Sequence, residues 1–141
     1  MDLSSVASAE KFTRIPLRRA ESGALTVPCS IHGQPARLLL DTGAFITIFH
    51  DDFLKSAGIP LEATRISAHF ARGLARKVRA GQIDDLKIGD FETPPAKFGV
   101  TSLPNFTLLQ GSAKISGILG MDKLYDWHGI IDLDRMNLFL K

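Results

Sequence analysis

The sequence predicts a mainly β, single-domain fold: a closed barrel with one or two short helices and one long hairpin. Short runs in which apolar and polar residues alternate recur along the chain, and turn residues separate them, as in half-buried strands. A length of 141 residues suits one domain with a substantial core and is too short for two. The composition, 45% hydrophobic and 23% charged, is that of an ordinary globular protein.

The first part of the chain contains four predicted strands and one predicted helix. Alternation and turn signals place the strands at Phe12–Arg19, Leu25–Ile31, Arg37–Leu40 and Phe45–Phe49. A helix is expected over Asp51–Ala57, because Asp51 or Asp52 can cap its start and Gly58 follows its end.

The middle of the chain predicts a long hairpin with strands at Leu61–Phe70 and Lys77–Ile88. Gly89-Asp90 signals a tight turn, and Pro94-Pro95 confines the next strand to an edge position or a late start. The polar composition of residues 102–112 predicts an irregular surface loop.

The last part of the chain predicts a second helix and a closing hairpin. Helical spacing covers Met121–Trp127 and puts Leu124 and Trp127 on one side. The hairpin strands are expected at Ile130–Leu133 and Leu138–Leu140. No linker, repeat or low-complexity segment interrupts the sequence.

Charge is nearly balanced overall but unevenly distributed. A net charge of +2 argues against a dedicated nucleic-acid binder, so no nucleic-acid partner is expected. One stretch without acids nevertheless contains Arg65, Arg72, Arg76, Lys77 and Arg79. A solvated edge or hairpin is the simplest explanation of this stretch, and an acidic partner or substrate is the alternative.

The single cysteine and the hydropathy pattern bear on the cellular compartment. Cys29 excludes an internal disulfide, and its alternating context predicts a small buried residue. No apolar segment approaches the length of about 20 residues that spans a bilayer, and residues 1–10 lack the pattern of a signal peptide. We expect a cytoplasmic protein if the chain is complete, and a periplasmic or membrane-anchored one if a leader or anchor has been removed.

The most informative segment is Asp41-Thr42-Gly43-Ala44, which follows the apolar run Leu38-Leu39-Leu40 and occurs once. A carboxylate directly after a buried strand is costly to ionise unless the protein uses it. Thr42 offers a hydroxyl that can brace the turn, while Gly43 and Ala44 leave the backbone open to close approach. The alternative is an aspartate that only caps the backbone amides of a tight turn.

Much later in the chain, Ile118-Leu119-Gly120 repeats the pattern of apolar residues ending in glycine. Together the two segments resemble the active-site architecture of retropepsin-like aspartic proteases, as a bacterial-type member, over roughly residues 25–140. The resemblance implies that Asp41 is catalytic and that Thr42, Gly43 and Ala44 support its loop. It implies that Ile118-Leu119-Gly120 crosses behind this loop and that a short helix follows.

The resemblance also implies a flap, which is a hairpin that closes on the substrate. Its tip is expected at Ala71, Arg72, Gly73 and Leu74. The protease domain is placed at residues 23–141, after an N-terminal extension or strand at residues 1–22.

Aspartic proteolysis uses two adjacent carboxylates that share one proton and hold one water molecule. The chain supplies one Asp-Thr-Gly and no Asp-Ser-Gly, so each chain holds half a site. A two-fold homodimer is therefore expected to pair two copies of Asp41. The expected activity is endopeptidase cleavage of a peptide or protein, without a metal or other cofactor. A non-catalytic dimeric peptide-binding module of the same fold is the alternative, and a basic hairpin that binds acidic ligands is the third.

One position departs from the viral members of the family. Those enzymes follow the late glycine with an arginine that pairs with an acid just beyond the catalytic motif. Here Met121 takes the place of the arginine, and Phe45 and Ile46 occupy the facing region. The viral style of dimer bracing is therefore not expected in this chain.

The other polar candidates give weaker signals. Asp122 suits a helix start and Asp132 suits a strand end. His50 beside two aspartates is typical of a helix entrance. The histidines lack the paired spacing of a zinc site and are scattered at His32, His50, His69 and His128. No serine lies in a nucleophile elbow, and no glycine loop has a phosphate-binding signature.

Overall fold

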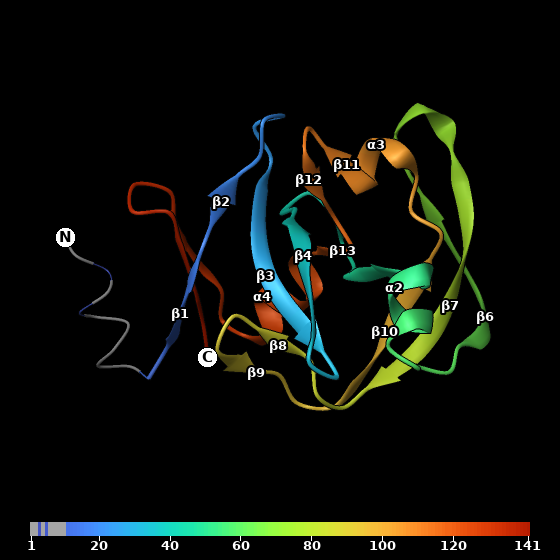
Figure 1. The fold of residues 1–141 in the computed structure, drawn as a ribbon, viewed down its shortest axis with the longest axis horizontal. Helices are drawn as coiled ribbons and strands as arrows, with labels where there is room; N and C mark the ends of the chain where they lie inside the picture. The colour runs from blue at the N-terminus through green and yellow to red at the C-terminus, as the bar shows by residue number, and fades with distance from the viewer. Residues whose placement is uncertain (1–2, 4, 6–10) are drawn as a thin grey trace.

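The computed structural model describes residues 3, 5 and 11–141. Of the predicted N-terminal segment 1–22, residues 1–2, 4 and 6–10 lie outside the described residues. The mainly β prediction is confirmed, since strands dominate the described chain (Figure 1). No helix in this part of the chain is both long enough and apolar enough to cross a membrane.

The main sheet contains ten strands. Their bounds are β2 (Arg18–Arg19), β3 (Leu25–Ile31), β4 (Gln34–Leu40), β5 (Ile48–His50), β6 (Glu62–His69), β7 (Ala75–Ile83), β8 (Lys87–Ile88), β9 (Phe91–Glu92), β10 (Ala96–Thr101) and β13 (Gly117–Leu119). The order is β6-β7-β10-β5-β13-β4-β3-β8-β9, with β2 paired to β3. The outermost strands of this order, β6 and β9, are not hydrogen-bonded to each other. The sheet therefore curls into a barrel-like shape that hydrogen bonds do not close, which corrects the closed barrel that was predicted.

Two smaller sheets complete the β structure. One contains β1 (Thr13–Pro16), β15 (Asn137–Leu140) and β14 (Ile130–Asp132), in that order. The other is a short pair of β11 (Leu109–Gln110) and β12 (Ala113–Lys114). The strands β14 and β15 form the closing hairpin that alternation predicts.

The helices at both predicted places are present, as α2 (Asp51–Ser56) and α4 (Met121–Asp126). The predicted cap of α2 is wrong: the N-cap residue is His50, and its side chain makes no capping hydrogen bond. The Asp51 carboxylate lies in the first helical turn and faces Arg79 at 3.4 Å and Lys55 at 4.0 Å. In α4, Leu124 is buried, as the helical spacing predicts.

Several predicted segments differ from the structure. The strands predicted at Phe12–Arg19 and Lys77–Ile88 are each divided in two, into β1 and β2 and into β7 and β8. The polar segment 102–112 is not irregular, because it contains the helical turn α3 (Asn105–Leu108) followed by β11. The carbonyl of Pro104 accepts hydrogen bonds from the amides of Thr107 and Leu108, which closes this turn. The strand predicted at Phe45–Phe49 begins only at Ile48, because the carbonyls of Ala44 and Phe45 bind the first amides of α4.

The alternating side chains of β4 divide between two apolar clusters. Leu38 and Leu40 point into the main core, which also holds Phe49 and Leu119. Leu39 packs against a second, smaller cluster formed by Ile48, Val78, Leu103 and Ile118. The strand that leads to Asp41 is thus held on both faces, so the position of the following loop is well fixed.

The hairpin of β6 and β7 projects beyond the rest of the sheet. Strand β10 pairs with β7 only from Arg79 to Ile83. Closer to the tip, β7 pairs with β6 alone, from Lys77 opposite Ser67 to Ala75 opposite His69. A 3-10 turn, η1 (Ala71–Gly73), joins the strands, and the Phe70 amide donates to the Leu74 carbonyl at 2.7 Å.

Candidate active site

The segment around Asp41 is the loop between β4 and β5, and β13 lies between these two strands. Strand β13 is parallel to β4, with Leu119 opposite Leu40, and antiparallel to β5, with Ile118 opposite Ile48. The loop must therefore cross the end of β13. The Asp41 amide donates to the Leu119 carbonyl at 3.0 Å, which anchors the loop where it leaves β4.

The crossing requires a glycine at position 120, because the loop leaves no room there for a side chain. A Cβ at this position would lie 2.6 Å from the Ile46 carbonyl oxygen and 3.0 Å from that of Ala44. Both contacts are to backbone, which cannot move aside as a flexible side chain can. The glycine of the Ile-Leu-Gly segment is thus required by the close approach of the loop.

The Asp41 side chain belongs to a tight turn but remains partly exposed. Its Oδ1 accepts a hydrogen bond from the Gly43 amide at 2.9 Å, and its carbonyl accepts one from the Ala44 amide at 3.2 Å. A Cβ on Gly43 would lie 3.2 Å from the same Oδ1. The turn therefore holds one carboxylate oxygen with a backbone donor, and Oδ2 accepts no hydrogen bond within the described residues.

Asp41 lines a cleft of about 680 Å³ that four segments enclose. The loop after β4, the tip-proximal residues of the β6–β7 hairpin, α3 and β13 all contribute to it. The lining residues are Leu39, Asp41, Gly43, Ala44, Phe45, Ile46, Ile48, Ser67, Ala68, His69, Phe70, Ala71, Phe106, Thr107 and Ile118. The cleft is thus mainly apolar, and within the described chain Asp41 is the one carboxylate in its lining.

The segment expected to be the flap tip lies at the end of the β6–β7 hairpin. Ala71, Arg72 and Gly73 form η1, and Leu74 follows it. Arg72 and Gly73 both have positive φ angles, 65° and 70°, which glycine adopts easily and arginine does not. Ala71 lines the cleft that contains Asp41. The guanidinium of Arg72 lies 5.4 Å from the centroid of the Phe106 ring.

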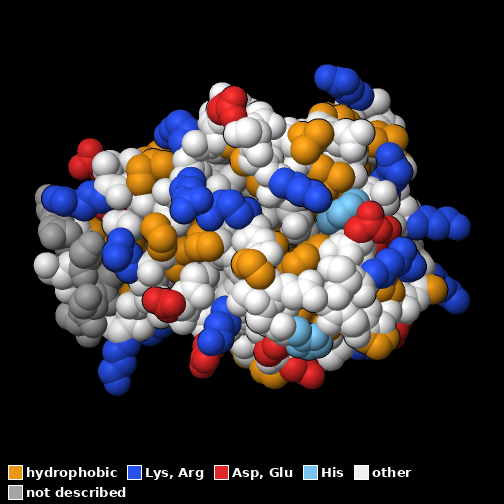
Figure 2. Space-filling model, viewed as in Figure 1, with side chains coloured by type: hydrophobic (Ala, Val, Ile, Leu, Met, Phe, Trp, Pro, Cys, Tyr) orange, Lys and Arg blue, Asp and Glu red, His pale blue; other side chains and the backbone are white. Residues whose placement is uncertain are grey.

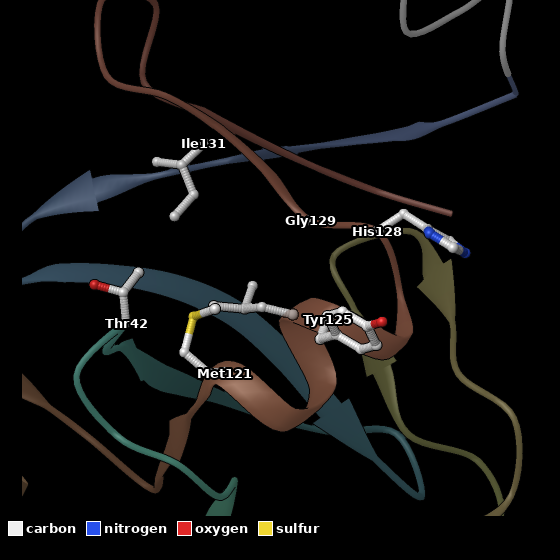
Figure 3. A pocket seen from close by; sticks show the side chains of 7 residues that line it. Thr42, Met121, Tyr125, His128, Gly129 and Ile131 are labelled. Carbon is white, nitrogen blue, oxygen red and sulfur yellow. The ribbon is translucent and has the colours of Figure 1, made fainter.

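Thr42 lines a different cavity, of about 780 Å³, on the other side of the loop. Met121, Leu124 and Tyr125 of α4 form one wall of this cavity, and His128, Gly129 and Ile131 form another (Figure 3). The side chains of Thr42, Met121 and Ile131 surround its open centre in Figure 3. Asp41 and Thr42 are neighbours in sequence but open onto separate surfaces.

The family resemblance places Thr47, with Ile46 and Ile48, as a continuation of the Asp41 motif, but it does not predict that Thr47 connects the loop to α4. Its buried hydroxyl donates to Asp122 Oδ1 at 2.8 Å and accepts from the Gly120 amide at 3.0 Å. The Met121 amide donates to the Ala44 carbonyl at 2.8 Å, and the Asp122 amide donates to that of Phe45 at 3.2 Å. These contacts hold the second half of the loop against the start of α4. The only signal of these contacts in the sequence is a threonine within an apolar run.

Phe106 and Thr107 of α3 line the cleft, and sequence reasoning did not assign them to the site. They lie in the segment predicted as an irregular loop. An aromatic residue within a polar stretch is the one signal that could have identified this wall of the cleft.

Of the remaining polar candidates, His69 lines the cleft and His128 lines the cavity that contains Thr42. The others are not among the described residues that line the cleft. The ligand atoms of His50, Asp51 and Asp52 lie within 4.8 Å of one another, but His50 Nδ1 already accepts a hydrogen bond from the Leu103 amide at 3.1 Å. Asp132 Oδ1 accepts from the amides of Asp134 and Arg135, which shapes a turn. Cys29 is buried, and burial raises the pKa of its thiol to about 12.

Comparisons with known proteins agree with this architecture. Residues 27–123 match the protein family described as Aspartyl protease. Two curated relatives, both named DNA damage-inducible protein 1, come from Neurospora crassa and Yarrowia lipolytica. They are 30% identical over 118 residues and 28% identical over 110 residues, which cover 83% and 77% of this chain. The chain spans only 25% of the length of each relative.

Solved structures share the fold. A retropepsin-like aspartic protease from Rickettsia conorii superposes with a TM-score of 0.63 at 20% identity, covering 92% of this chain and 91% of that one. The EIAV protease in complex with the inhibitor HBY-793 gives 0.55 at 18% identity, with coverages of 72% and 85%. The retroviral protease-like domain of Ddi1 from Leishmania major gives 0.53 at 20% identity, with coverages of 84% and 93%. From its family match, this chain belongs to the aspartyl protease family, and its fold is retropepsin-like.

Proposed function

We propose that this chain is an aspartic endopeptidase that acts as a homodimer, with one Asp41 from each copy in a shared site. The observation that carries the proposal is the position of Asp41. It follows the buried strand β4, remains partly exposed, and lines a mainly apolar cleft beneath the end of a projecting hairpin. A carboxyl group in such a cleft can serve as a general acid or base.

The surface beside Thr42 supports the homodimer. Several large apolar side chains there are exposed in the single chain: Phe45 is 89% exposed, Tyr125 81% and Met121 41%. Met121 and Tyr125 line the cavity that contains Thr42 (Figure 3). Phe45 follows Thr42 in the same loop and lines the Asp41 cleft. Exposed apolar groups that gather around one feature are typical of protein interfaces. A second copy placed here by a two-fold axis would bring the two Asp41 loops together.

The proposed reaction needs the two Asp41 carboxyl groups to hold one proton between them. Two carboxylates a few ångströms apart cannot both be ionised, so the pair has one acid and one base. The ionised Asp41 takes a proton from a water molecule as the water attacks the peptide carbonyl carbon. The protonated Asp41 donates its proton to the carbonyl oxygen. When the resulting diol collapses, a proton goes to the leaving nitrogen and the carbon–nitrogen bond breaks.

The cleft suits a peptide bound in an extended conformation. The tip-proximal residues of β6 and the loop after β4 line its opposite sides, together with the apolar surface of Ile48 and Ile118. A peptide strand between them can form backbone hydrogen bonds, while alternate side chains enter apolar pockets.

Substitution of Asp41 by asparagine tests the assignment. Asparagine is nearly isosteric but can neither accept the proton from water nor share one with its twin. We expect Asp41→Asn to abolish cleavage of a peptide library at acid and near-neutral pH, with an unchanged circular dichroism spectrum. Asp52→Asn, an exposed aspartate in α2, is the matched control and should cleave as the unaltered protein does.

Two outcomes would contradict the proposal. Cleavage retained by purified Asp41→Asn protein would remove the catalytic role of this residue. Peptide binding without cleavage by the unaltered protein, insensitive to Asp41→Asn, would favour the non-catalytic peptide-binding module.

A further inference from the structure

The half of the β6–β7 hairpin nearest its tip is a cationic surface without acidic partners. It carries Arg65, Arg72, Arg76 and Lys77, and no Asp or Glu lies between Arg65 and Arg79 in the sequence. Within the described chain, none of these four cations forms an ion pair, whereas Arg79 pairs with Asp51. Figure 2 shows Lys and Arg side chains projecting from the end of the molecule where Figure 1 places β6 and β7.

Two of these cations are related directly to the cleft. The Arg72 guanidinium stacks over the ring of Phe106, and Phe106 lines the cleft. Arg76 is directly opposite Ala68 in the register of β6 and β7, and Ala68 also lines the cleft. Because directly opposite residues in an antiparallel pair share a face, Arg76 is on the same face of the hairpin as Ala68.

Arg76 also has a hydrogen-bond donor that the described chain does not use. Its Nε is shielded from solvent and has no hydrogen-bond partner among the described residues. Shielded donors without a partner are rare in folded proteins, so an acceptor from a ligand would satisfy this one once a movement of the hairpin uncovers it. A carboxylate suits it best, because it matches the guanidinium in both charge and two-pronged geometry.

We propose that the substrates are acidic peptides, in which Asp or Glu side chains flank the apolar residues that enter the cleft. This inference rests on the proposed peptidase function and names the substrate class. Among the described residues that line the cleft, the ionisable ones are Asp41 and His69. The acidic side chains of the substrate therefore pair with Arg72 and Arg76 at the rim. In a two-fold dimer both hairpins contribute these cations, so acids are favoured on both sides of the cleaved bond.

Three matched peptide libraries test the preference. Each has the same randomised apolar centre, and the flanking positions are all Glu, all Gln or all Lys. We expect kcat/KM to be about ten-fold higher for Glu than for Gln flanks at low salt, and lowest for Lys, on the basis of roughly 1.8-fold for each of the four cations that two hairpins contribute. Raising the salt to about 0.5 M should shrink the difference, because it screens surface charges.

Two double variants locate the preference on the hairpin. Arg72→Gln with Arg76→Gln should lower kcat/KM for Glu-flanked peptides to the value that the same variant shows for Gln-flanked ones. Arg18→Gln with Arg19→Gln is the control, because it removes the same charge from exposed positions on β2. A Glu preference that survives the hairpin change, or that the β2 change abolishes equally, would overturn the assignment.

A binding measurement separates failure of this inference from failure of the proposed function. Labelled Glu-flanked and Gln-flanked peptides are titrated with Asp41→Asn protein and followed by fluorescence anisotropy. About ten-fold tighter binding of the Glu peptide supports the inference even if no cleavage is ever observed. Equal affinities overturn it even if the unaltered protein cleaves peptides. Tighter binding of a single-stranded oligonucleotide than of the Glu peptide would assign the cations to general polyanion binding and also overturn it.

Discussion

Thr47 links the Asp41 loop to the start of α4 through one buried hydroxyl. It donates to Asp122 and accepts from the Gly120 amide, and these partners lie more than 70 residues further along the chain. In viral members of the family an arginine after the late glycine fulfils a bracing role, and Met121 replaces it here. The Thr47–Asp122 contact supplies a brace within a single chain, at a place where the sequence alone shows none.

Replacing Thr47 by valine keeps the shape of the side chain and removes the hydroxyl. The Gly120 amide is then left without a partner in a buried position, at a cost of about 1–3 kcal/mol. We therefore expect Thr47→Val to lower the free energy of unfolding by that amount in urea titrations at fixed protein concentration. Thr47→Ser keeps the hydroxyl and is the control. Equal stability of the valine variant and the unaltered protein would show that the contact contributes nothing.

At the residue scale, the sequence predicted the residues of the Asp41 loop but not the contacts that hold the loop against α4. Asp41, Thr42, Gly43 and Ala44 could be singled out because a carboxylate after three leucines is unusual by itself. Thr47 could be named as a continuation of this motif, but its contacts could not be predicted, since its partners are brought together only by the fold.

Among the elements, the β6–β7 hairpin is the one most suited to movement. Its last residues pair only within the hairpin, and an added Cβ at Gly73 would meet no atom within 4 Å. Few buried contacts therefore oppose a change of its position. This arrangement agrees with the flap role that the family resemblance implies.

We expect Gly73→Val to reduce turnover of peptides while leaving the melting temperature nearly unchanged. The φ angle of Gly73 is 70°, which a β-branched residue adopts only with strain, so the tip must rearrange. A rearranged tip cannot close properly over a substrate, but it costs few packed contacts. Gly73→Asn is the control, because asparagine tolerates this conformation. A large drop in melting temperature with normal turnover would show that the hairpin is a structural element.

Element prediction succeeded where side-chain periodicity was strong. The sequence predicted α2, α4 and the β14–β15 hairpin close to their observed bounds, because apolar spacing and turn residues mark them. It missed α3, since four residues give too few turns for periodicity to emerge. It also predicted a closed barrel, although strand pairing at the two ends of a sheet depends on contacts that no local pattern encodes.

The whole molecule is predicted to be active only as a pair of chains. Activity per milligram should therefore fall on dilution, as the dimer dissociates. A mixing experiment tests the same point with greater precision. If unaltered and Asp41→Asn chains exchange freely, only pairs of two unaltered chains are active. Activity at constant total protein should follow the square of the unaltered fraction, so an equal mixture retains about a quarter.

The matched control for mixing is the dilution of unaltered protein with Asp52→Asn chains, which should leave activity unchanged at every ratio. A linear response to Asp41→Asn, with about half of the activity left after complete exchange, would mean that each chain carries a complete site. That outcome would contradict the shared site while leaving the family membership intact.

The pairing of β1 with β15 and the position of β13 also have a consequence for how the protein is made. Thr13 lies opposite Leu140, and β13 supplies the strand between β4 and β5 only once Leu119 has been added. A growing chain on the ribosome therefore contains Asp41 long before it contains the residues that hold the Asp41 loop in place. Contacts so distant in sequence form late in folding. Any proteolytic activity therefore requires that synthesis has proceeded at least as far as Leu140.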